Sequence, residues 1–232
     1  MSATNSSFSR LTNRIFPRMP DFYRLIIEEC NLADHAATTL EEYVRTGHHS
    51  RTLLIARLDQ EGERLRQRNL DILKNAFATP MDRVDLYRAF TSTDCILGYA
   101  HAITTEMDEL HIATNRSIQQ MVELLREAVL TLGTGYRKLA TDEVAAADQD
   151  AQAVIQACKR IETLFREALA NLFTGEQYVE HMQARQEEAE VQAMHYVLDI
   201  FKRREIYRHI SDAARDMRAA SNILHHIVVK VA

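Results

Sequence analysis

Apolar residues recur at intervals of three and four over most of this chain, a spacing that places them on one face of an α-helix. Two stretches show the pattern most regularly, and each continues for about seven helical turns. Their stripes consist of Leu86, Phe90, Thr93, Leu97, Ala100, Ile103, Met107 and Leu110, and of Ile206, Ile210, Ala213, Met217, Ala220, Leu224, Ile227 and Val231. A half-buried strand would instead alternate with a period of two. The pattern therefore predicts an all-α chain of long helices.

Cap residues divide the pattern into six helices. Asp21 is a good N-cap and Gly47 a good helix end, while Thr79 can cap a helix whose first turn holds Pro80. The predicted helices span 21–47, 50–77, 79–111, 115–140, 141–173 and 193–231. Near Gly133 we expect the fourth helix to kink, and its end is expected there or near residue 140.

The composition excludes several classes of protein. The 232 residues include 6 Gly, 3 Pro and no Trp, too few turn residues for a sheet protein. No apolar run approaches the roughly 18–20 residues needed to cross a bilayer. A formal charge of -5 gives no general attraction to nucleic acid. The 3 cysteines are odd in number and lie within helical patterns, which predicts reduced thiols and a cytoplasmic location.

No catalytic constellation can be recognised. A ferritin-like di-iron bundle needs a Glu-x-x-His motif on two helices, and the chain offers one weak match, which ends at His111. The adjacent His48 and His49 could bind metal, but such a pair in a polar turn is usually solvated. We therefore expect that the protein is not an enzyme, and the sequence assigns it no cofactor.

Four acidic residues occupy positions where a carboxylate needs a partner. Asp59 and Glu63 are four residues apart on one helix edge, where spacing alone predicts exposed acids bridged to Arg64, Arg66 or Arg68. Asp94 lies at the edge of the stripe of the third helix, and a carboxylate there needs a partner. Glu162 lies at the centre of a predicted buried face, so it must be paired or protonated.

Residues 77–87 read Phe-Ala-Thr-Pro-Met-Asp-Arg-Val-Asp-Leu-Tyr and join the second and third predicted helices. This segment resembles a phrase in the PhoU-like accessory proteins of Pit-type phosphate transporters, close to Phe-Ile-Thr-Pro-Ile-Asp-Arg-Glu-Asp-Ile. Segments 59–63 and 159–173, and the phrases 205–207 and 227–230 in the last helix, are also similar to that family. The resemblance covers about residues 15–232. It implies an elongated PhoU-like bundle of six long helices in two three-helix repeats.

Similarity between segments of the two halves agrees with two repeats. Segment 85–88 reads Asp-Leu-Tyr-Arg and segment 205–208 reads Glu-Ile-Tyr-Arg, while 73–77 matches 169–173. We expect one PhoU-like domain, 20–232, with repeats at about 20–111 and 114–232. The preceding residues 1–19 hold three arginines and no acid, which favours a flexible basic tail; an organelle transit peptide is the alternative.

The resemblance also implies a metal site at Asp59, Glu63, Asp94 and Glu162. The family's acidic motifs are incomplete here. At positions where the family has acids, this chain has Cys95, Gly98, Cys158, Arg160, Arg215, Arg218 and Ala219. We expect a positive charge near Glu162 to substitute for a cation, so that the second half binds no metal. The first half is expected to bind a divalent or iron ion weakly.

The function implied by the resemblance is accessory or regulatory, in inorganic phosphate transport, through contact with a Pit-type permease. The basic cluster Lys202, Arg203, Arg204 and Arg208 is the candidate contact with acidic transporter loops or anionic lipid, which would place the protein peripherally at the inner membrane face. The alternative for this cluster is a solvated face paired with nearby acids.

Two other functions stay open from the sequence. The chain could be a metal-binding helical bundle or a helical scaffold unrelated to phosphate. Tyr178 and Met182, in the connection before the last helix, hint at a homo-oligomer.

Overall fold

The computed structural model describes residues 19–174 and 189–231. The helices are α2 (Phe22–Thr46), α3 (Ser50–Asn75), α4 (Arg83–Glu109), α5 (Arg116–Ala140), α6 (Val144–Phe173) and α8 (Ala189–Val231). They include 88% of the described residues, among which there is no strand. The prediction of an all-α chain of six long helices is therefore confirmed. The predicted tail, apart from its last residue, and the residues Tyr178 and Met182 lie outside the described ranges.

Helix α2 begins and ends where its cap residues predict. The Asp21 carboxylate accepts a hydrogen bond from the backbone N–H of Arg24 at 3.0 Å, which satisfies one of the free amides of the first turn. At the other end Gly47 adopts a left-handed conformation with φ of 69°, and its N–H bonds to the carbonyl of Tyr43.

Helix α4 begins later than the sequence predicts. Its N-cap is Asp82, whose carboxylate accepts from the N–H of Val84 at 2.8 Å, so the assignment of Thr79 as the cap and Pro80 as the first turn is wrong. An aspartate cap also places a negative charge at the positive end of the helix dipole. The guanidinium of Arg83 then donates to a carbonyl in the last turn of α3 at 2.7 Å, which holds the connection between α3 and α4 against α3.

Helix α5 runs through its glycines to Ala140, the later of its two expected ends. A Cβ on Gly135 would lie 2.6 Å from Cδ2 of Leu224, and a Cβ on Gly133 would lie 3.2 Å from Cβ of Cys30. These glycines therefore allow α8 and α2 to approach the backbone of α5 closely.

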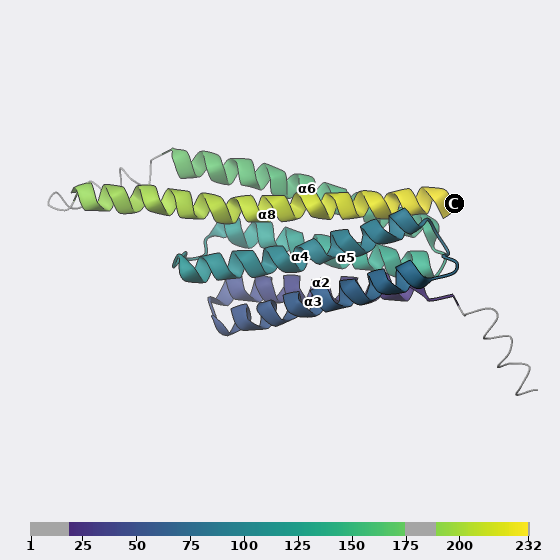
Figure 1. Ribbon diagram of the computed structural model, residues 1–232. Coiled ribbons are helices and arrows are strands. Elements are labelled where there is room, and N and C mark those ends of the chain that lie inside the picture. The colour runs from purple at the N-terminus through teal and green to yellow at the C-terminus, as the bar shows by residue number, and fades with distance from the viewer. Residues whose placement is uncertain (1–18, 175–188, 232) are drawn as a thin grey trace, which may run out of the picture.

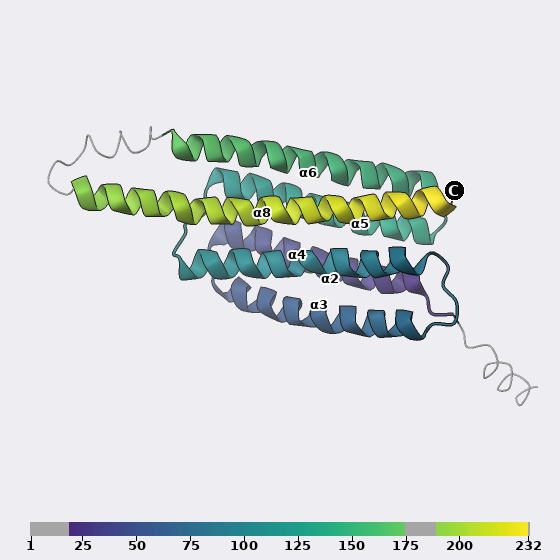
Figure 2. The same cartoon turned by 45° about the horizontal axis from the view of Figure 1, so that its top comes forward.

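The helices lie nearly parallel or antiparallel and form an elongated bundle (Figure 1). Helices α2, α3 and α4 pack on one another, as do α5, α6 and α8. Contacts between α2 and α5, and between α4 and α8, join these two groups. The second view separates α3 on one side of the bundle from α6 on the other (Figure 2). Within the described residues no helix has the length and apolar content needed to cross a membrane.

Helix α8 is longer than its neighbours. Its 43 residues correspond to about 65 Å at 1.5 Å per residue. Both views show its N-terminal end extending past the ends of the other helices (Figures 1 and 2). The remainder of α8 is buried against α4, α5 and α6 through the stripe that the sequence predicts, from Ile206 to Ile227.

Candidate functional site

Three of the four acids expected to bind metal meet where α3 packs on α4. Helix α3 contributes Asp59 and Glu63, and α4 contributes Asp94. Between the two α3 acids lies Gly62, where a Cβ would be 3.1 Å from Oδ1 of Asp94 and equally close to Leu97. The absence of a side chain at this position therefore allows Asp94 to lie against α3.

Each of these acids has a different environment. Nε of Arg66 lies 2.8 Å from Oδ2 of Asp94, and Nδ1 of His101 lies 2.9 Å from Oδ2 of Asp59. Glu63 is exposed and has no ion pair within the described residues. Burial raises the pKa of Asp94 and the charges of Asp59 and Glu63 raise it further, while Arg66 opposes them.

The predicted bridges from Asp59 and Glu63 to nearby arginines on α3 are therefore wrong. Arg66 instead reaches across to α4, and Arg68 reaches to Glu28 on α2 at 2.5 Å. Helices α2 and α4 flank α3. Acids on these two helices form the ion pairs with Arg66 and Arg68 that the spacing along α3 assigns to acids of α3 itself.

A buried carboxyl that the sequence analysis missed lies next to this cluster. Glu29, on α2, is 4% exposed, and its Oε1 accepts a hydrogen bond from Nδ2 of Asn69 at 2.7 Å. Its Oε2 is buried without a hydrogen-bond partner. Burial raises the pKa of Glu29 to about 8, against the lowering effect of the Asn69 bond, so the carboxyl is mostly protonated at neutral pH.

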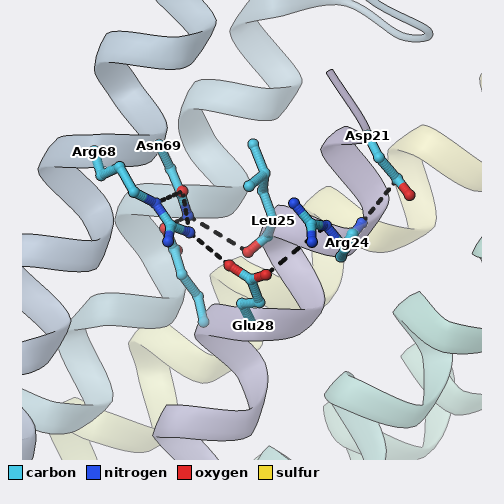
Figure 3. A network of polar contacts seen from close by, with 7 residues as sticks. Asp21, Arg24, Leu25, Glu28, Arg68 and Asn69 are labelled. Atoms are coloured by element: carbon cyan, nitrogen blue, oxygen red, sulfur yellow. Dashed lines mark hydrogen bonds and ion pairs between the residues drawn. The ribbon is translucent and has the colours of Figure 1, made fainter. Parts of the chain in front are cut away.

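A chain of polar contacts fixes Asn69 in place (Figure 3). The Arg68 guanidinium donates to Oδ1 of Asn69 at 2.9 Å and to Glu28 at 2.5 Å. Because Oδ1 accepts from Arg68, the amide nitrogen of Asn69 faces inward, toward Glu29 and the carbonyl of Leu25. Glu29 is thus linked through Asn69 to the exposed end of Arg68.

In the second half of the bundle, Glu162 is not buried as the sequence predicts. Its side chain is 36% exposed, and Nη1 of Arg218 lies 2.8 Å from its Oε1. The face of α6 that packs inward centres on Val154, Cys158 and Ile161, one position away from Glu162. A positive charge therefore lies beside Glu162, as the replacement of family acids by arginines predicts.

The residues present do not form a metal site as they are placed. No group of three or more His, Cys, Asp or Glu side chains in the described parts of the chain is arranged to hold a metal ion. A metal ion in the first half would have to compete with Arg66 for Asp94 and with His101 for Asp59. Metal at Asp59, Glu63, Asp94 and Glu162 therefore stays a prediction.

A second polar cluster lies at the other end of the first three helices, around Asp108. Its carboxylate accepts hydrogen bonds from the hydroxyls of Tyr43 at 2.5 Å and Thr52 at 2.6 Å. The same carboxylate pairs with Nδ1 of His49 at 2.6 Å. Burial alone would raise the pKa of Asp108, but these three contacts outweigh it and hold that pKa below its usual value. His49, which the sequence predicts to be solvated, is exposed but bonded through this contact.

The basic cluster on α8 is largely engaged within the protein. Lys202 donates to the carbonyl of Leu110 at 3.1 Å, and Arg203 donates to the carbonyl of Ala113 at 3.0 Å, so both hold the connection between α4 and α5. Arg203 also pairs with an acid one turn earlier, and Arg208 pairs with acids on its own helix. Arg204 is exposed and has no ion pair among the described residues.

Two solved structures from Shewanella oneidensis MR-1 are similar to this chain. A PhoU-like protein superposes with a TM-score of 0.71 and 14% sequence identity, covering 90% of this chain and 100% of its own. A protein described as a PhoU-like phosphate regulatory protein gives a TM-score of 0.68 with the same identity and coverage. The fold of this chain is PhoU-like.

At 14% identity the likeness shows the fold alone. No protein-family model and no curated protein sequence matches the chain. The PhoU-like bundle explains why the acids of α3 and α4 converge, since α3 packs on α4. This packing does not show what the acids bind, which depends on the side chains that contact them.

Proposed function

We propose that this protein regulates the uptake of inorganic phosphate by direct contact with a Pit-type phosphate permease. The observation that supports this most is the match of its PhoU-like bundle to the whole chain of a protein described as phosphate regulatory. The sequence phrase at 77–87 adds the narrower resemblance to accessory proteins of Pit-type transporters.

Contact is the mode of action that the side chains favour. At the interface of α3 and α4, Asp94 is paired with Arg66 and Asp59 with His101, and the carboxylate of Asp108 is bonded by Tyr43, Thr52 and His49. These groups stabilise helix packing, which leaves surface recognition as the function for which the bundle is suited. The protein then acts at the cytoplasmic face of the membrane that holds the permease.

Arg204 is the best candidate for the permease contact. Its charge is exposed and unpaired in the described part of the chain, whereas Lys202 and Arg203 hold the connection between α4 and α5. A basic side chain at a membrane surface contributes about 1 kcal/mol. Reversing the charge of Arg204 removes this attraction and adds a repulsion of similar size, about 2 kcal/mol in all, which should weaken an acidic or anionic contact by roughly thirty-fold.

The test is affinity recovery of the tagged protein from native membranes, with Arg204→Glu compared with Arg57→Glu. Arg57 is an exposed arginine on α3 that has no ion pair within the described residues. We expect the permease to be recovered with the native protein and with Arg57→Glu, and to be reduced with Arg204→Glu. Equal recovery with all three proteins would exclude Arg204, and no recovery with any would count against the permease. Stoichiometric bound metal without permease would favour a metal-binding bundle instead.

A further inference from the structure

The first turns of α8 expose a continuous apolar stripe. Met194, Val197, Leu198 and Phe201 are 61%, 44%, 46% and 54% exposed, respectively. Their spacing of three, one and three residues places all four on one face of the helix. Single exposed apolar residues are ordinary, but a contiguous apolar patch commonly marks an interaction site.

The stripe lies beyond the part of α8 that the bundle covers. Lys202 and Arg203 bond to the connection between α4 and α5, and Asn115 donates to the hydroxyl of Tyr207 at 2.7 Å. These contacts mark the level at which α4 ends and α5 begins, and the residues of α8 before Lys202 extend past it (Figures 1 and 2). Phe173, the last residue of α6, is 59% exposed near this end of the bundle.

The stripe is complementary to itself. In an antiparallel pair of helices whose two-fold axis passes between Val197 and Leu198, Phe201 of one copy faces Met194 of the other. Leu198 of each copy then faces Val197 of the other. An isologous interface needs one patch that fits itself in this way, and sulfur against an aromatic ring is a favourable contact. We propose that a second copy of this chain docks here, α8 against α8, to form an antiparallel dimer.

The exposed area is sufficient for a weak dimer. Taking roughly 200 Å² for a large side chain, the exposed parts of the four stripe residues amount to roughly 400 Å² per copy. Two copies would bury roughly 800 Å², within the range of weak, transient interfaces. The dimer is therefore expected to depend on concentration and to dissociate on dilution.

The charges near the stripe favour a second copy over an anionic lipid surface. From residue 189 to residue 201 the sequence contains two acids and no Lys or Arg. Of the three basic residues that follow, Lys202 and Arg203 bond to the connection between α4 and α5, which leaves Arg204 as the cation beside the stripe without an ion pair among the described residues. Helices that lie on anionic membranes are usually rich in Lys and Arg beside their apolar face. A stripe with a single unpaired cation beside it gains little from such a membrane, whereas an apolar contact between two proteins needs no cation.

Sedimentation of the full chain over a wide range of concentration tests the proposal. We expect the mass to rise from 26.7 kDa toward twice that value as concentration increases. Leu198→Glu should remain a monomer throughout, while Leu53→Glu, at a 68% exposed site on α3, should still form the dimer. Circular dichroism would check that both variants are folded.

Cross-linking tests the antiparallel arrangement. Mild oxidation of Met194→Cys mixed with Phe201→Cys should give more disulfide-linked dimer than either variant alone, with Cys95 replaced by Ser in both. A native chain that stays monomeric at every concentration would overturn the proposal, because the face is then covered by the same chain or by another partner. Binding of the native chain, but not of Leu198→Glu, to phosphatidylserine vesicles in place of dimerisation would overturn it in favour of a membrane.

Discussion

Replacing Glu29 with glutamine should change how the stability of the bundle depends on pH. Burial raises the pKa of the Glu29 carboxyl from its ordinary value to about 8. Between pH 5 and pH 8 the folded protein therefore keeps a proton on Glu29 that the unfolded chain has released. Stability from this group is greatest below the unfolded pKa and decreases as the pH rises toward the folded pKa. Glutamine has the same shape but no proton to lose in this range.

The expected magnitude follows from the two pKa values. Each pH unit between them lowers the free energy of unfolding by about 1.4 kcal/mol, and the loss levels off above the folded pKa. From pH 6 to pH 9 the native protein should therefore lose about 2.5 kcal/mol relative to Glu29→Gln. For a chain of this size that corresponds to a relative change in melting temperature of roughly 5–10 °C.

Urea unfolding followed by circular dichroism at pH 6, 7, 8 and 9 gives the required difference between the two proteins. Other titrating groups contribute equally to both and cancel in that difference. Glu127→Gln, at an exposed site on α5, serves as the control and should show no change across the range. A constant difference between the native protein and Glu29→Gln from pH 6 to pH 9 would refute the argument, since it would mean that Glu29 is already ionised at pH 6.

Three further outcomes are expected. Gly135→Ala should lower the free energy of unfolding by about 1–3 kcal/mol, because the added Cβ would meet Leu224. Gly98→Ala, in open space on α4, should instead raise the free energy of unfolding by up to about 1 kcal/mol. Urea unfolding measures both variants, and equal effects would exclude close packing at Gly135. In native buffer a thiol reagent should modify Cys95 first, because burial raises the pKa of each of the other two cysteines to about 12; rapid modification of three thiols would contradict their burial. Glu162→Gln should leave the metal content of the purified protein unchanged in elemental analysis, and loss of tightly held metal would show that the second half binds it.

Hydrophobic spacing is sufficient to predict the helices, because the apolar stripe of a helix depends only on residues within that helix. The buried stripe of α8, from Ile206 to Ile227, lies where the sequence places it. The start of α4 is harder to place from the sequence, since Thr79, Pro80 and Asp82 each favour a first turn. The choice depends on the connection to α3, which Arg83 holds through bonds that the local sequence does not show.

The partners of the acidic residues were the least predictable part of the site. Asp94 pairs with Arg66 and Glu162 pairs with Arg218, and each pair joins two helices whose relative rotation is set by packing. Glu29 did leave a signal in the sequence, because it lies four residues after Leu25, in phase with the buried stripe of α2. An acid at such a position predicts a buried carboxyl with a raised pKa.

Phosphate uptake by cells that lack this protein tests the central proposal most directly. Uptake of radiolabelled phosphate would be measured in the deletion strain, in the same strain supplied with the native protein, and in the strain supplied with Arg204→Glu. We predict that deletion changes uptake through the Pit-type permease, that the native protein restores it, and that Arg204→Glu restores it only in part. Identical uptake in the deletion strain and the parent would contradict a role in phosphate transport.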